Sequence, residues 1–160
     1  MSLTNKINTD MRQIQFRAKV KYPENYHGKR DIAEGEWVSG DLHLRCRFPH
    51  IHTDIFNSYP IDTETIGQFI GMNYPDGTRA YEGDIVTGRS EEDTEDIMLV
   101  IEYGVINRVM PRNKENLLRI PCFYFKEVKT GEKLFPCVDE GREEMFPLAG
   151  NIYDNPELLK

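Results

Sequence analysis

The chain has 160 residues, of which 39% are hydrophobic and 29% charged. This length and composition suit one domain with a core, and they exclude global disorder. No stretch approaches the ~20 apolar residues of a membrane-spanning helix, no signal peptide is visible, and the three widely spaced cysteines fit a reducing cytosol rather than a disulfide scaffold. We therefore expect a cytoplasmic protein without a membrane partner.

The charge is unevenly distributed. The net charge is −7, which disfavours a generic DNA-coating role. However, residues 1–50 carry nine Lys/Arg against six Asp/Glu, whereas residues 51–160 carry 11 against 21. This asymmetry indicates two faces with different partners, or one face that meets the other.

Alternation of apolar and polar residues predicts strands in the N-terminal part. It extends from Ile14 to Tyr22 and again from Leu42 to Phe48. Glu36 to Val38 is predicted to form the strand before the second of these, and Ser39-Gly40-Asp41 is predicted to be the turn between them.

Further strands are predicted in the rest of the chain. Ile97 to Tyr103 is almost entirely apolar and predicts a buried strand with Ile85 to Gly88 as its hairpin partner, joined by the solvated acidic loop Ser90 to Asp96. Cys122 to Val128 and Leu134 to Val138 form another predicted pair.

Helical structure is expected only as short turns. Asp62 is a predicted cap for a turn at Thr63 to Thr65, Pro75-Asp76-Gly77 predicts a tight turn, and Asn155-Pro156 predicts the start of a short C-terminal helix. Short strands at close spacing point to a small barrel or sandwich.

Four sequence blocks carry a family resemblance. They are MRQIQFRAK at Met11–Lys19, EGEWVSGDL at Glu34–Leu42, the segment Pro60–Val86, which ends in YEGDIV, and AGNIYDNPELL at Ala149–Leu159. In this order they resemble the YopX family of bacteriophage and prophage proteins. The resemblance implies an SH3-like β-barrel fold, an accessory role in a phage within the bacterial cytoplasm, and no assignable catalytic residues.

The resemblance also suggests a division of the chain. Residues 1–10 are interpreted as an N-terminal extension, residues 11–60 as an N-terminal β subdomain, and residues 61–160 as the SH3-like barrel, with one integrated domain as the alternative. Residues 22–32 look like an insertion, and residues 48–59 do not match the family blocks.

Glycines and polar turn residues in the matched blocks are predicted to be structural rather than to line a binding site. Glycine permits sharp turns and close packing, and short polar side chains can bond turn amides. The predicted structural residues are Gly67, Gly71, Gly83, Asp84, Gly150 and Asn151.

Potential metal ligands gather in one segment: His43, Cys46, His50, His52 and Asp54. Two imidazoles in a His-x-His pair can ligate zinc. Strand alternation, however, points His43 away from Cys46, and Pro49 interrupts the strand before His50. We therefore expect surface or loop histidines, and no metal or cofactor is predicted.

No catalytic motif is present. The sequence has no GxSxG, phosphate-binding glycine loop or HExxH, and alternation buries the Cys46 thiol. We predict a non-enzymatic protein with no small-molecule substrate.

Basic side chains line the polar faces of the two N-terminal strands. If the strands share a sheet, these side chains form one cationic docking surface, with solvation as the plainer alternative. Its residues are Arg17, Lys19, Lys21, His43, Arg45 and Arg47. The expected partner is an acidic protein or a second copy. The disfavoured alternative is nucleic acid, for which Phe123–Phe125 offers stacking rings.

Overall fold

The fold is mainly β, as predicted. A computed structural model describes residues 13–45, 47–89, 96–110, 113–135 and 146–160. It contains eleven strands and two 3₁₀ turns. Their bounds are β1 Phe16–Lys19, β2 Trp37–His43, β3 His50–His52, β4 Ser58–Pro60, η1 Thr63–Thr65, β5 Gly67–Asn73, β6 Arg79–Tyr81, β7 Asp84–Arg89, β8 Asp96–Met110, β9 Asn113–Glu127, β10 Lys133–Leu134, β11 Leu148–Asn151 and η2 Pro156–Leu159.

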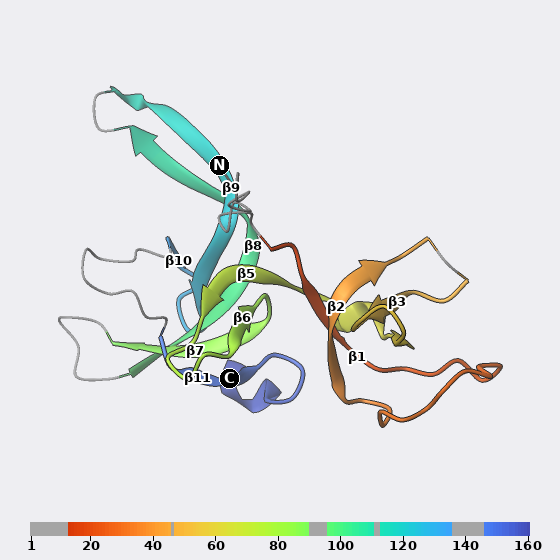
Figure 1. Cartoon of the computed structure of the whole chain (residues 1–160). Coiled ribbons are helices and arrows are strands. Elements are labelled where there is room, and N and C mark those ends of the chain that lie inside the picture. Colours follow the sequence, from red (N-terminus) through yellow and green to blue (C-terminus); the bar gives the residue numbers. More distant parts are fainter. Residues whose placement is uncertain (1–12, 46, 90–95, 111–112, 136–145) are drawn as a thin grey trace, which may run out of the picture.

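The strands form two antiparallel sheets (Figure 1). One sheet has six strands in the order β4-β3-β2-β1-β5-β6, and the other has five in the order β10-β9-β8-β7-β11. Neither sheet closes on itself among the described residues, so the predicted SH3-like barrel is not confirmed.

Strand β2 differs from the prediction. Residues 39–41 are not a turn but lie inside this strand, and they pair with β1 on one side and approach β3 on the other. Gly40 permits this because a Cβ there would lie 1.9 Å from the carbonyl oxygen of His52. The glycine therefore marks a close approach of two backbones rather than a turn.

The predicted strand from Leu42 to Phe48 is wrong beyond His43, where β2 ends. Leu44 is 56% exposed instead of facing the core, and Cys46 lies outside the described residues. The alternating pattern in this segment continues past the point where the backbone leaves the sheet, so periodicity alone did not locate the strand end.

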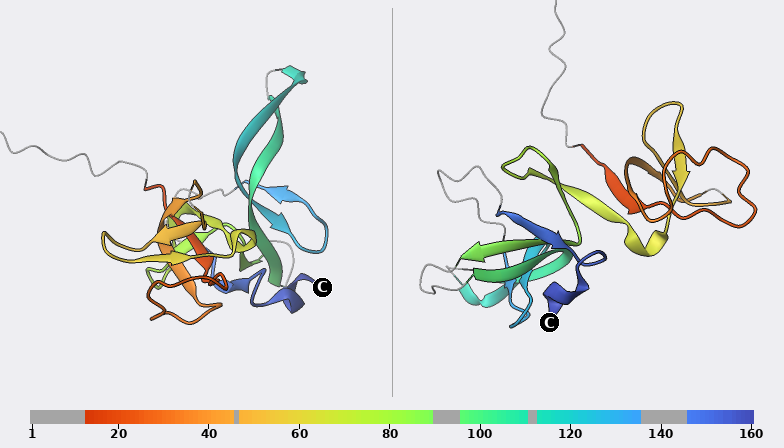
Figure 2. Two further views of the ribbon diagram at one scale, coloured as in Figure 1. Left: turned by 90° about the vertical axis from the view of Figure 1, so that its right-hand side faces the viewer. Right: turned by 90° about the horizontal axis from the view of Figure 1, so that it is seen from below.

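The predicted β7–β8 hairpin is confirmed, with Ile85 opposite Val100. The sequence did not predict that β8 and β9 pair along most of their length, from Leu99 opposite Glu127 to Met110 opposite Asn113. Figures 1 and 2 show the outer part of this hairpin extending well beyond the other strands of the five-stranded sheet. Residues 90–95 of the acidic loop and the predicted strand end at Val138 lie outside the described residues.

Each sheet has its own core. The first contains Ala18, Val20, Val38, Ile51, Tyr59 and Ile61. The second contains Tyr74, Ala80, Val86, Leu99, Ile101 and Phe125. The β5–β6 hairpin links them, because it pairs with β1 in the first sheet while Tyr74 and Ala80 pack in the second core.

The predicted short turns are present. Asp62 caps η1 by accepting a 3.2 Å hydrogen bond from the Glu64 amide. The chain turns at Gly77, whose φ is +84°. Asn155 precedes η2 but does not cap it with its side chain; its Oδ1 instead accepts from the Asn151 amide.

Candidate functional site

Arg17 is a half-buried link between the sheets rather than part of a free cationic surface. Its guanidinium forms an ion pair with Asp84, whose side chain is only 1% exposed. It also lies between two aromatic rings, 4.6 Å from the centroid of Trp37 and 4.9 Å from that of Tyr81. The positive charge of Arg17 is therefore paired inside the fold rather than presented to solvent.

Asp84, which the sequence predicts to be structural, has two hydrogen-bond donors besides Arg17. Its Oδ2 accepts hydrogen bonds from the Tyr74 hydroxyl at 2.7 Å and from the Tyr81 amide at 2.9 Å. Burial, followed by the charge of Asp84 and this bond, raises the pKa of Tyr74, so Tyr74 remains a donor at neutral pH.

The other predicted structural residues occupy tight or strained positions. Gly71 and Gly83 have positive φ, and a Cβ on Gly67 or Gly150 would lie within 2.5 Å of a neighbouring oxygen. The side chain of Asn151 accepts from the amides of Tyr153 and Asp154.

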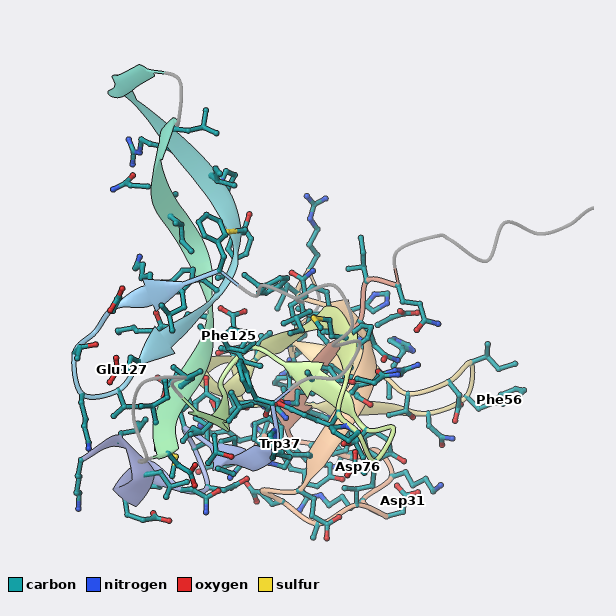
Figure 3. The ribbon with its side chains drawn as sticks, turned by 90° about the vertical axis from the view of Figure 1, so that its left-hand side faces the viewer. Asp31, Trp37, Phe56, Asp76, Phe125 and Glu127 are labelled. Atoms are coloured by element: carbon teal, nitrogen blue, oxygen red, sulfur yellow. The ribbon has the colours of Figure 1, made fainter. Side chains whose placement is uncertain are left out.

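Lys19 is paired as well, with Asp154 of the C-terminal segment. Asp154 also accepts a 2.8 Å hydrogen bond from the indole of Trp37 and one of 2.7 Å from Asn151. Partial burial disfavours the carboxylate, but the bonds from Asn151, Lys19 and Trp37 outweigh this and lower the pKa of Asp154 to about 2. Figure 3 shows Trp37 in the middle of the molecule.

The remaining predicted cations are dispersed. Lys21 pairs with Asp62 at 3.0 Å, and this hydrogen bond is the main cause of the raised pKa of Lys21. Arg45 and Arg47 are exposed and lie beyond the end of β2. His43 faces its neighbours in β3. The six predicted residues therefore do not form one sheet face.

The structure brings together three histidines that the sequence analysis weighed as metal ligands and then interpreted as surface or loop residues. The β2–β3 register places His43 opposite His50, and His52 follows two residues later. One ring nitrogen from each lies within 4.8 Å of the others. His50 and His52 lie in a half-buried strand, not in the predicted loop. The sequence signal for this cluster is the His-x-His pair of His50 and His52, which lies close to His43 in the chain.

The β8–β9 hairpin, here called the arm, is the most prominent exposed feature. Alternation places Ile101 and Phe125 of the second core on the same face as Tyr103, Val105, Pro121 and Phe123 further along. Tyr103 is 55% exposed, Val105 is 37% exposed, and the rings of Tyr103 and Phe123 meet edge to face at 5.2 Å. Figure 3 shows Phe125 where the arm leaves the core.

The opposite face of the arm is more polar at its base. Glu102 forms an ion pair with Lys126 at 3.1 Å and accepts from the Tyr124 hydroxyl at 2.8 Å. Tyr124 and Phe125 are buried, so two of the three rings in the aromatic run, which the disfavoured nucleic-acid alternative would use for stacking, pack inside the fold.

A cavity of about 400 Å³ lies beside the arm base. Its lining is mixed: Ile66, Ile101, Ile152 and Leu159 supply apolar surface, and Glu82, Glu102 and Lys126 supply charged groups. Of these, Glu102 and Lys126 pair with each other.

Comparison with known families matches residues 15–160 to the family described as YopX protein. The match covers nearly the whole chain, so the protein belongs to the YopX family. Comparison with curated proteins finds no significant match. Within the described part of the chain, no helix has the length and apolar character needed to cross a bilayer.

Proposed function

We propose that this YopX-family protein is a non-enzymatic interaction module that self-associates through its arm. The observation that carries the proposal is the apolar face formed by Tyr103, Val105, Pro121 and Phe123, which extends the second core into solvent. An isolated two-stranded ribbon is marginally stable in water. Covering this face with the same face of a second copy would stabilise the arm.

The edge of β8 supports the same proposal. Strand β7 covers this edge only from Asp96 to Val100. Beyond that point no described strand pairs with it. A strand edge of this kind is a template for pairing with another chain, and pairing around a two-fold axis would use the same patch on both copies.

The charged residues favour a protein partner over nucleic acid. Three of the predicted docking cations, Arg17 and Lys19 of β1 and Lys21 just beyond it, already have carboxylate partners, so they do not offer free charge to a phosphate backbone. The accessory role in a bacteriophage and the cytoplasmic location belong to the same proposal.

The proposal is tested by sedimentation velocity on the full chain across a concentration series. The wild type should associate. The double variant Tyr103→Lys/Val105→Lys should shift association to at least about tenfold higher concentration, because burying two ammonium groups in an apolar interface is costly. High salt should not dissociate the wild type, since the contact is apolar.

Leu118→Lys is the matched control, because Leu118 is also exposed on the arm (46%) but lies on its opposite face. This variant should associate like the wild type, and circular dichroism should show that all variants are folded. A wild type that stays monomeric at every concentration, or a double variant that associates unchanged, would refute the proposal.

A further inference from the structure

Three of the four histidines in the chain converge on one face of the β2–β3 hairpin. The ring centroids of His43 and His52 are 4.5 Å apart, those of His50 and His52 are 4.8 Å apart, and the rings of His43 and His50 stack at 5.4 Å. The fold therefore gathers three imidazoles from positions separated by up to nine residues in the sequence.

A backbone contact fixes the ring of His50. Its Nδ1 lies 2.9 Å from the carbonyl oxygen of Phe48. Because a carbonyl can only accept, Nδ1 carries the proton and Nε2 keeps a free lone pair. A metal-ligating histidine usually donates the N–H of one ring nitrogen to a backbone carbonyl or a similar acceptor and presents its other nitrogen to the metal. Without metal, this lone pair accepts a hydrogen bond from the Nε2–H of His52, 2.9 Å away, and a bound cation would take the place of that proton.

The spacing suits a small divalent cation. Zinc–nitrogen bonds of 2.0–2.1 Å in tetrahedral geometry place ligand nitrogens about 3.3 Å apart. The His50–His52 pair is a few tenths of an ångström closer than this, and the widest separation in the cluster is 4.8 Å. Side-chain rotation would bring the three nitrogens to this spacing, and such rotation is open to them because His43 is exposed and His50 and His52 are only half-buried.

An acidic residue lies beside the histidine cluster. Asp41 pairs with His52 across the strands and so lies on the same side of the hairpin. Its carboxylate adds negative charge beside the cluster, which compensates an incoming cation.

We propose that His43, His50 and His52 form a binding site for a divalent transition-metal ion of the zinc class, with a fourth coordination position left to water or another ligand. Three imidazole nitrogens select zinc, cobalt, nickel or copper over magnesium and calcium, which prefer oxygen ligands. The site lies on the first sheet, away from the arm, and does not depend on the self-association proposed above.

The test is calorimetric titration of the metal-free full chain with zinc chloride, together with visible absorption of the cobalt(II) form as a reporter of coordination geometry. The wild type should bind zinc and not magnesium. His50→Gln and His43→Gln should each weaken zinc binding by at least about tenfold. Loss of a residue that only hydrogen-bonds a metal ligand already lowers the affinity by about this factor, and loss of a ligand should lower it at least as much. Binding should also weaken as the pH falls below about 6, because protons compete for the imidazoles.

His27→Gln is the matched control, because His27 is the one histidine outside the cluster. It should bind zinc like the wild type. His43 is exposed, so His43→Gln keeps the test valid if His50→Gln alters the fold, and circular dichroism without metal checks this. The proposal is overturned if the wild type does not bind zinc, or if the triple variant His43→Gln/His50→Gln/His52→Gln keeps wild-type affinity through other donors. It is also overturned if His27→Gln loses as much affinity as His43→Gln.

Discussion

The contact between Arg17 and Asp84 shows how one residue pair can hold the two sheets together. Arg17 lies in β1 of the six-stranded sheet, and Asp84 begins β7 of the five-stranded sheet. Two further donors, from Tyr74 and Tyr81, complete the partners of the carboxylate. A buried charge with all its partners is tolerated, whereas removing one partner leaves the other charge uncompensated.

Asp84→Asn should therefore lower the free energy of unfolding by about 3–5 kcal/mol, because it leaves the Arg17 guanidinium without its counter-charge. Urea denaturation at neutral pH measures the change. Glu36→Gln, which alters an exposed acid, should stay within about 0.5 kcal/mol of the wild type. An Asp84→Asn protein as stable as the Glu36→Gln control would contradict the role of Asp84 as a structural anchor.

At the scale of elements, the sequence predicted which segments are strands better than it predicted how they pair. The β7–β8 hairpin was predictable because its apolar residues are dense and its partner is close in the chain. The pairing of β8 with β9 was missed because the outer half of the arm mixes exposed Asn107 and Arg119 with exposed apolar residues, so the alternation there is weak.

The binding residues were less predictable than the strands. Alternation correctly separates the sides of β1, but it does not say which side meets a second sheet, so Arg17 was interpreted as solvent-facing. The histidine cluster depends on the β2–β3 register, which periodicity within one strand does not define. In both cases the missing information is a contact between segments that are distant in the pattern: the packing of the second sheet for Arg17, and the β2–β3 register for the histidines.

Gly40 sets that register. Gly40→Ala would place a methyl group 1.9 Å from the backbone oxygen of His52, and a backbone atom cannot rotate away. We expect the variant to lose about 3 kcal/mol of stability, the upper end for overpacked sites, and to bind zinc more weakly than the wild type. Ser39→Ala, on the exposed neighbour in β2, is the control. Thermal unfolding measures the stability of both, and equal values for the two variants would contradict this account.

The whole molecule consists of two cores that share few connections. Apart from the Arg17–Asp84 pair and the β5–β6 hairpin, the C-terminal segment joins them: β11 pairs with β7 in one sheet, while Asp154 contacts Lys19 and Trp37 of the other. Trp37 is the single tryptophan of the chain. Its fluorescence therefore reports this junction directly.

The junction should weaken in acid. The folded-state pKa of Asp154 is lowered from 3.8 to about 2, so its carboxylate stabilises the fold above pH 4, and this contribution is lost as the pH falls from about 4 to about 2. Asp154→Asn should destabilise the protein at pH 7 by about 1 kcal/mol or less, because the group is partly exposed. Near pH 2 the variant and the wild type should differ little.

Urea titrations followed by Trp37 fluorescence at the two pH values measure this difference. Glu157→Gln, in the neighbouring η2 turn and exposed, serves as the control and should not alter the transition at either pH. Suppose the free energies of unfolding of Asp154→Asn and the wild type differ as much near pH 2 as at pH 7. This result would show that the carboxylate charge does not stabilise the junction.

The bond between the Trp37 indole and Asp154 joins residues 117 positions apart. During translation the chain leaves the ribosome from its N-terminus, at about 5–20 residues per second. Strands β1 to β4 are therefore made several seconds before Asp154 exists, with Lys19 and Trp37 still uncovered. The first sheet must remain soluble on its own during that interval, and it takes its final place only when synthesis reaches the end of the C-terminal segment.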